Sequence, residues 1–148
     1  MNKASINEVQ NEIIEEFSIL GDDRESTIFY IMELGGKLPL MNEKNKVPEN
    51  IIKGCQSKVW LTTELNGDRI KFQADSNTEI TKGLVSLLIR VLSDQKAEDI
   101  VQSDLYFIEK IGMGRLIGSQ RSNGFAAMIK QMKLYAFAYK SKIERAAS

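Results

Sequence analysis

The sequence predicts an α+β fold in which helices flank a small antiparallel β-sheet. Two segments rich in β-branched and aromatic residues, 58–65 and 69–75, are separated by a turn that begins with Asn66-Gly67, a strong signal for a β-hairpin. Apolar residues recur at three- and four-residue spacing on both sides of this hairpin, which is typical of amphipathic helices. The chain has no internal repeat and no linker, so we expect its 148 residues (1–148) to form one domain.

Before the hairpin, the sequence predicts two helices and a loop. Ser5 and Glu8 form an S-x-x-E capping box, and the apolar stripe that follows ends at Gly21. A second helix is expected to close at Gly35-Gly36, since glycine commonly follows the last turn of a helix. The segment 37–50 holds both prolines among charged and amide residues, which indicates an ordered loop, and the two isoleucines after it favour a short strand.

The hairpin is expected to bury one face. Alternation places the following residues on that face: Val59, Leu61, Thr63, Leu65, Ile70, Phe72 and Ala74. Ser76 and Glu79 form a second S-x-x-E pair, which predicts the start of another helix. This helix is too apolar for a surface element, so we expect it to be central, with a core formed by Ile80, Leu84, Leu87, Leu88, Val91 and Leu92.

The last third of the chain predicts short elements and then a long helix. Helical pieces are expected around 97–102 and 104–111, followed by a glycine-punctuated loop over 112–124. An amphipathic helix is predicted over 125–145. Arg121 would then lie in the loop just before this helix.

Composition excludes several classes of function. Twenty Lys and Arg balance twenty Asp and Glu, without a dense basic cluster, so nucleic acid is not an expected partner. The N-terminus lacks the apolar core of a signal peptide and no apolar run could span a membrane, so we expect a cytoplasmic protein. With no histidine and one cysteine, Cys/His catalysis, Ser/His/Asp triads, His-bearing zinc sites and iron–sulfur clusters are excluded, and no metal site is expected.

Cys55 is the residue with the clearest chemical potential. It lies between Gly54 and Gln56, in polar surroundings that differ from those of a buried packing cysteine. Lys53 and Lys58 are predicted to favour its thiolate, the nucleophilic form. These residues alone do not decide whether the thiol of Cys55 is reactive or inert, so both interpretations stay open.

Four stretches resemble one known family, in the family's order. The segment GCQSKVWL (54–61) is similar to the motif around the reactive cysteine of the SufE family of sulfur-acceptor proteins. YIMELGGKLP (30–39), ADSNTEITKGLVSLL (74–88) and SQRSNGFAAMI (119–129) resemble three further SufE segments. One departure is Asn77, where the family often has Asp, and it weakens the idea of an acidic pair that steers docking.

The resemblance implies a fold shared with IscU-type scaffolds and a role in sulfur transfer. Cys55 would accept sulfane sulfur, as a persulfide, from a pyridoxal-phosphate-dependent cysteine desulfurase of the SufS or CsdA type and pass it to an iron–sulfur scaffold complex. The chain would carry no cofactor of its own, because pyridoxal phosphate belongs to the desulfurase. It would act as a carrier and desulfurase activator rather than as an enzyme, and as a monomer or weak homodimer.

The resemblance also implies supporting roles for other residues. Six positions match family motifs: Gly54, Gln56 and Ser57 around the cysteine, and Asp75, Lys82 and Arg121 on the partner side. Arg121 is assigned either to the partner surface or to holding the cysteine loop. In the family the resting loop shelters the thiol, and docking exposes it.

Two other classes of function stay open. A regulatory module could bind and activate a desulfurase with an inert cysteine. A cysteine hydrolase with a lysine or aspartate base is disfavoured, because the sequence shows no paired base motif.

Overall fold

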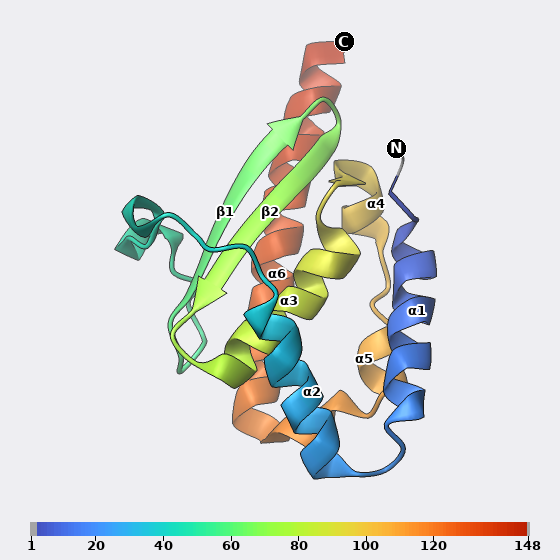
Figure 1. The fold of residues 1–148 in the computed structure, drawn as a ribbon. Helices are drawn as coiled ribbons and strands as arrows, with labels where there is room; N and C mark the ends of the chain where they lie inside the picture. Colours follow the sequence, from blue (N-terminus) through green and yellow to red (C-terminus); the bar gives the residue numbers. More distant parts are fainter. Residues whose placement is uncertain (1–2, 148) are drawn as a thin grey trace.

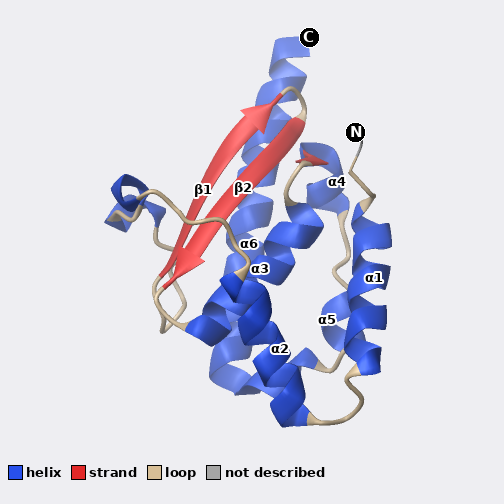
Figure 2. Ribbon diagram, viewed as in Figure 1, coloured by secondary structure: helices blue, strands red, loops and turns tan. Residues whose placement is uncertain are grey.

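The computed structural model describes residues 3–147 and shows a small antiparallel sheet with helices packed around it (Figures 1 and 2). The strands β1 (Val59–Asn66), β2 (Arg69–Ser76) and β3 (Gln95–Lys96) form a three-stranded sheet in the order β1-β2-β3. The helices are α1 (Ile6–Ile19), α2 (Arg24–Gly36), α3 (Glu79–Leu92), α4 (Ala97–Gln102), α5 (Phe107–Lys110) and α6 (Met113–Ala147). The predicted α+β class is therefore confirmed.

The hairpin is antiparallel and has the predicted buried face. Leu61 pairs with Ala74 and Thr63 with Phe72, so the predicted apolar residues share one side of the sheet. The hairpin contacts α3 through β2 and α6 through the Thr63–Tyr139 hydrogen bond, and in Figure 1 α6 runs behind the hairpin while α3 lies beside it. The strand β3 was missed, because a two-residue strand carries no alternation that a sequence pattern can reveal.

The first helix begins as the sequence predicts, and the second begins at an aspartate cap. The Ser5–Glu8 capping box is present, with each side chain bonded to the other's backbone N–H. α2 starts after Asp23, whose carboxylate accepts from the N–H groups of Glu25 and Ser26. Both helix starts are thus fixed by local hydrogen bonds.

α3 is the central helix, as predicted, but its start is different. Ser76 does not cap it: this residue ends β2, and its hydroxyl donates to the carbonyl of Lys58 at 2.8 Å. Thr78 is the N-cap instead, without a side-chain capping bond. The predicted second capping box is therefore wrong, because strand pairing with Val59 holds Ser76 in extended backbone.

The predicted glycine loop over 112–124 is also wrong. Only Gly112 (φ 72°) and Gly118 (φ 81°) of this segment leave the right-handed helical region. α6 therefore begins at Met113, is interrupted at Gly118, and carries Arg121 inside its long second part. Glycine is only modestly unfavourable within a helix, so Gly114 and Gly124 are tolerated inside α6.

The segment 37–50 is ordered, as predicted, and contains two short 3₁₀ helices, η1 (Glu43–Asn45) and η2 (Pro48–Asn50). It projects beside the hairpin in Figure 2. Of the two isoleucines that follow, Ile51 makes an isolated bridge to Trp60 rather than a full strand. None of the helices in residues 3–147 is long and apolar enough to cross a lipid bilayer.

Candidate functional site

Cys55 lies in a short loop that is anchored at both ends. Before the cysteine, the N–H of Ile52 donates to the carbonyl of Val59 at 2.9 Å. After it, the N–H of Lys58 donates to the Asn77 side-chain oxygen at 3.0 Å, and the N–H of Asn77 donates to the Lys58 carbonyl at 3.2 Å. The Asn77 amide oxygen thus holds the loop through an acceptor that an aspartate would also supply.

Gly54 allows the loop to turn beside α6. Its φ of 96° lies in the region that favours glycine, and a Cβ there would lie 3.1 Å from the Cβ of Ala127. The predicted role of Gly54 in a tight loop thus has a physical basis, although the residue does not touch the thiol pocket.

The Cys55 thiol is half-buried and faces α6. Its S–H donates to the carbonyl of Gly124 at 3.4 Å, and a Cβ on Gly124 would lie 3.5 Å from the sulfur. Burial raises the pKa of this thiol above its ordinary value. The prediction that Lys53 and Lys58 lower this pKa is therefore wrong: both side chains are exposed, and desolvation decides the direction.

A pocket of about 170 Å³ opens beside the thiol. Loop, α3 and α6 all contribute to its lining, which consists of Cys55, Gln56, Ser57, Thr78, Ile80, Thr81, Leu84, Gln120, Arg121, Gly124 and Met128. The structure thus brings Arg121 together with Cys55, Gln56 and Ser57. Arg121 is exposed, and within residues 3–147 its guanidinium has no hydrogen-bond or ion-pair partner.

Ser57 connects the loop to the first turn of α3. The hydroxyl of Thr78 donates to Ser57 Oγ at 3.0 Å, and that of Thr81 donates to the same atom at 3.2 Å. Sequence reasoning missed both threonines. The three-residue spacing of these threonines at a helix start can be read from the sequence, but it does not show that they bond to Ser57.

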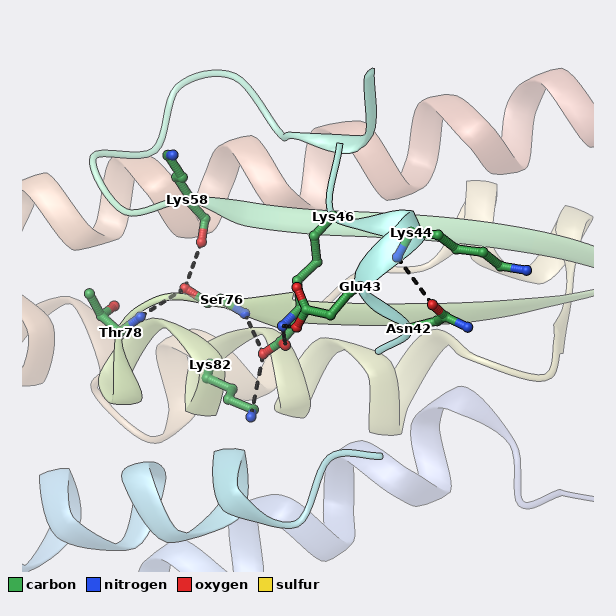
Figure 3. A network of polar contacts seen from close by, with 9 residues as sticks. Asn42, Glu43, Lys44, Lys46, Lys58, Ser76, Thr78 and Lys82 are labelled. Atoms are coloured by element: carbon green, nitrogen blue, oxygen red, sulfur yellow. Dashed lines mark hydrogen bonds and ion pairs between the residues drawn. The ribbon is translucent and has the colours of Figure 1, made fainter. Parts of the chain in front are cut away.

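Asp75 lies outside the thiol pocket, in an ion-pair network that Figure 3 shows. Its carboxylate is 2.9 Å from the Lys46 ammonium and 3.3 Å from that of Lys82, and it accepts from the N–H of Ser76 at 2.8 Å. Lys46 also pairs with Glu43 at 3.0 Å.

Asp75 is ionised in this network despite its burial. The residue is only 5% exposed, and desolvation alone would raise its pKa. The hydrogen bonds from Lys46 and Ser76 and the charge of Lys82 outweigh that effect, so the pKa of Asp75 lies below its ordinary value.

The predicted partner residues therefore occupy two different places. Asp75 is itself buried and binds the partly exposed Lys46 and Lys82, whereas Arg121 lies at the thiol pocket. Their role toward a partner stays a prediction. Lys46, which the sequence analysis did not single out, also lies over the ring of Trp60, 5.7 Å from its centroid.

The described part of the chain holds no group of three or more His, Cys, Asp or Glu side chains placed to bind a metal ion. The chemistry that the site offers is that of one thiol in a pocket with hydroxyl, amide and guanidinium groups.

Comparisons with known proteins assign the chain to a family. The SufE family model, described as the Fe-S metabolism associated domain, matches residues 11–136. An uncharacterised SufE-like protein of Rhizobium etli is 38% identical over 128 residues, which cover 83% of this chain and 86% of that protein. An uncharacterised SufE-like protein of Rhizobium meliloti is 37% identical over 128 residues, covering 83% of this chain and 91% of its own.

A solved structure has the same fold. The solution structure of a hypothetical protein from Thermus thermophilus superposes with a TM-score of 0.74, at 15% identity, over 90% of this chain and 96% of its own. The family model and the two relatives show that the chain belongs to the SufE family.

Proposed function

We propose that this protein carries sulfur as a persulfide on Cys55. The donor is a pyridoxal-phosphate-dependent cysteine desulfurase, which this protein also stimulates, and the acceptor is an iron–sulfur cluster scaffold. The observation that carries the proposal is a single thiol on an anchored loop beside a small pocket, in a chain of the SufE family.

The transfer needs only thiolate chemistry. The Cys55 thiolate attacks the outer sulfur of the donor persulfide, the donor's S–S bond breaks, and the donor's inner sulfur leaves with the electron pair as a thiolate. Cys55 then carries the persulfide, and a scaffold thiolate repeats the same attack on its outer sulfur. No histidine and no external oxidant is required.

The resting site supports a carrier that is activated by docking. The thiol donates a hydrogen bond to the Gly124 carbonyl, so it is held in its protonated form, and burial opposes its ionisation. A partner that draws the loop away from α6 removes both effects and exposes the nucleophile. The loop is thus a two-state element whose open state the partner favours.

The direct test is sulfur loading. The protein is incubated with a cysteine desulfurase and L-cysteine, and its intact mass is measured without reductant. We expect a gain of one sulfur atom, mapped by peptide mass spectrometry to Cys55, and no gain for Cys55→Ser. A wild-type protein that stays unmodified while the desulfurase turns over would refute the carrier function.

The alternative, a regulatory module that activates the desulfurase without carrying sulfur, gives a different result. A carrier loses its stimulation of the desulfurase in Cys55→Ser, because the donor persulfide is no longer removed. A pure regulator keeps its stimulation in this variant.

A further inference from the structure

Ser57 contributes a hydroxyl group to the pocket beside Cys55. A serine hydroxyl has one donor hydrogen and two acceptor lone pairs. Thr78 and Thr81 donate to its oxygen at 3.0 and 3.2 Å, which occupies both lone pairs. The O–H of Ser57 is therefore left to donate, and it has no acceptor among residues 3–147.

The two threonines fix the direction of this free donor. Thr78 is the N-cap of α3 and Thr81 lies in its first turn, where it is only 7% exposed. The Ser57 hydrogen points away from both threonine hydroxyls, because their hydrogens occupy the other two tetrahedral positions on the oxygen. Ser57 and Cys55 line the same pocket of about 170 Å³, which is the space available to that hydrogen.

A loaded cysteine would present an acceptor in this space. A persulfide carries its outer sulfur about 2 Å beyond Sγ, and that sulfur is an anion once it loses its proton. A partly buried anion is costly unless hydrogen-bond donors surround it. Gln56 and Gln120 are the neutral amides of the lining, and Arg121 is its one charged side chain among the described residues.

We propose that Ser57 donates its hydroxyl hydrogen to the outer sulfur of the Cys55 persulfide, and that Thr78 and Thr81 are positioning residues that hold Ser57 for this contact. The inference rests on the proposed sulfur-carrier function and deepens it. The resting thiol, bonded to Gly124, does not use this donor; the loaded form does.

The test loads Cys55 with inorganic polysulfide, so it does not depend on a desulfurase. The Cys55 thiolate attacks a polysulfide sulfur, one S–S bond breaks, and the shorter polysulfide leaves with the electron pair. The loaded protein is then alkylated with iodoacetamide over a series of pH values, and intact mass gives the rate. The midpoint is the pH at which the alkylation rate is half-maximal, and it reports the ionisation of the outer sulfur.

We expect Ser57→Ala to raise this midpoint by about one pH unit or more, because a hydrogen bond to a charged group is lost. Ser57→Thr, which keeps a hydroxyl, should restore the wild-type midpoint. Ser141→Ala removes a hydroxyl from α6 outside the pocket lining and should leave the midpoint unchanged. The charged groups on the surrounding elements, Lys53, Lys58, Glu79, Lys82 and Arg121, are the same in every variant.

An unchanged midpoint in Ser57→Ala overturns the role of Ser57 and leaves the carrier function standing. Failure of the desulfurase to load the wild-type protein overturns the carrier function and leaves the polysulfide profile to decide on Ser57. Circular dichroism checks that each variant is folded. If Ser57→Ala is unfolded, the same pH profile is measured on the double variant Thr78→Val, Thr81→Val. In this variant the serine hydroxyl is free to turn away from the sulfur, so we expect the midpoint to rise as well.

Discussion

At the residue scale, the resting state of Cys55 is set by burial and by one backbone carbonyl. Its S–H donates to the carbonyl of Gly124, and a Cβ at position 124 would make an ordinary van der Waals contact with the sulfur at 3.5 Å. The flanking Lys53 and Lys58 extend into solvent, where water screens their charge. Desolvation therefore outweighs the neighbouring positive charge, and the pKa of the resting thiol is raised.

This gives a testable pH dependence for the thiol. Because the folded pKa is raised, alkylation of unloaded Cys55 by iodoacetamide should reach its half-maximal rate at a higher pH than alkylation of the same cysteine in urea-unfolded protein. The measurement is the labelling rate by intact mass in both states. A folded-state midpoint at or below the unfolded one would contradict the account of the resting site.

At the element scale, the crossing of α2 and α3 is built on two glycines. A Cβ on Gly83 would lie 2.0 Å from the carbonyl oxygen of Ile31, and a Cβ on Gly35 would lie 2.6 Å from the backbone N of Gly83. Helices can approach this closely only where side chains are absent. Gly83 lies close in sequence to Thr78 and Thr81, whose hydroxyls donate to Ser57 in the cysteine loop.

Two adjacent glycines of α2 should therefore respond oppositely to alanine. Gly35→Ala is expected to destabilise the protein by about 1–3 kcal/mol or more, because the new methyl group meets backbone atoms that cannot turn away. Gly36→Ala is the matched control: nothing lies within 4 Å of its Cβ position, so it should be neutral or stabilise by up to about 1 kcal/mol. Urea unfolding measures both, and equal effects would contradict the close crossing.

At the scale of the whole molecule, Asp75 ties together three separate parts of the chain. It lies on β2 and binds Lys46 from the segment after η1 and Lys82 from α3 (Figure 3). Since Lys46 also lies over Trp60, this network fastens the segment 37–50 to the outer side of the hairpin. Lys46 has a second carboxylate partner in Glu43, whereas Asp75 is the one ion-pair partner of Lys82 in residues 3–147.

The network should make stability depend on pH in a defined direction. The pKa of Asp75 is lower in the folded than in the unfolded state, so its stabilisation is present above about pH 4 and is lost as the pH falls through the folded value. At neutral pH we expect Asp75→Asn to cost about 1–3 kcal/mol of unfolding free energy. Urea unfolding should show this difference shrinking as the solution is acidified.

Glu64→Gln provides the control, because Glu64 is an exposed carboxylate on β1 with no hydrogen-bond or ion-pair partner in the described chain. It should change stability by less than about 0.5 kcal/mol at any pH. An Asp75→Asn penalty that is as large in acid as at neutral pH would show that packing, rather than ionisation, holds this site.

Much of the fold could be predicted because it is encoded locally. The Ser5–Glu8 capping box, the alternation of the hairpin and the apolar density of α3 each depend on residues that are close in sequence, and all three are confirmed. The wrong predictions concern segments whose structure depends on contacts between residues far apart in the sequence. Pairing of Ser76 with Val59 displaced the start of α3, and Met113 and Ile117 of the predicted glycine loop are buried as part of α6.

By itself, the sequence determined the fold class, the family motifs and Cys55 as the one cysteine of the chain, since composition and periodicity are properties of the chain alone. Only the tertiary structure decided the state of that thiol and its neighbours. The Gly124 carbonyl, the hydroxyls of Thr78 and Thr81, and the Lys46–Asp75 pair meet their partners across long stretches of chain. Desolvation and hydrogen bonding depend on that three-dimensional proximity, which no local pattern of residues records.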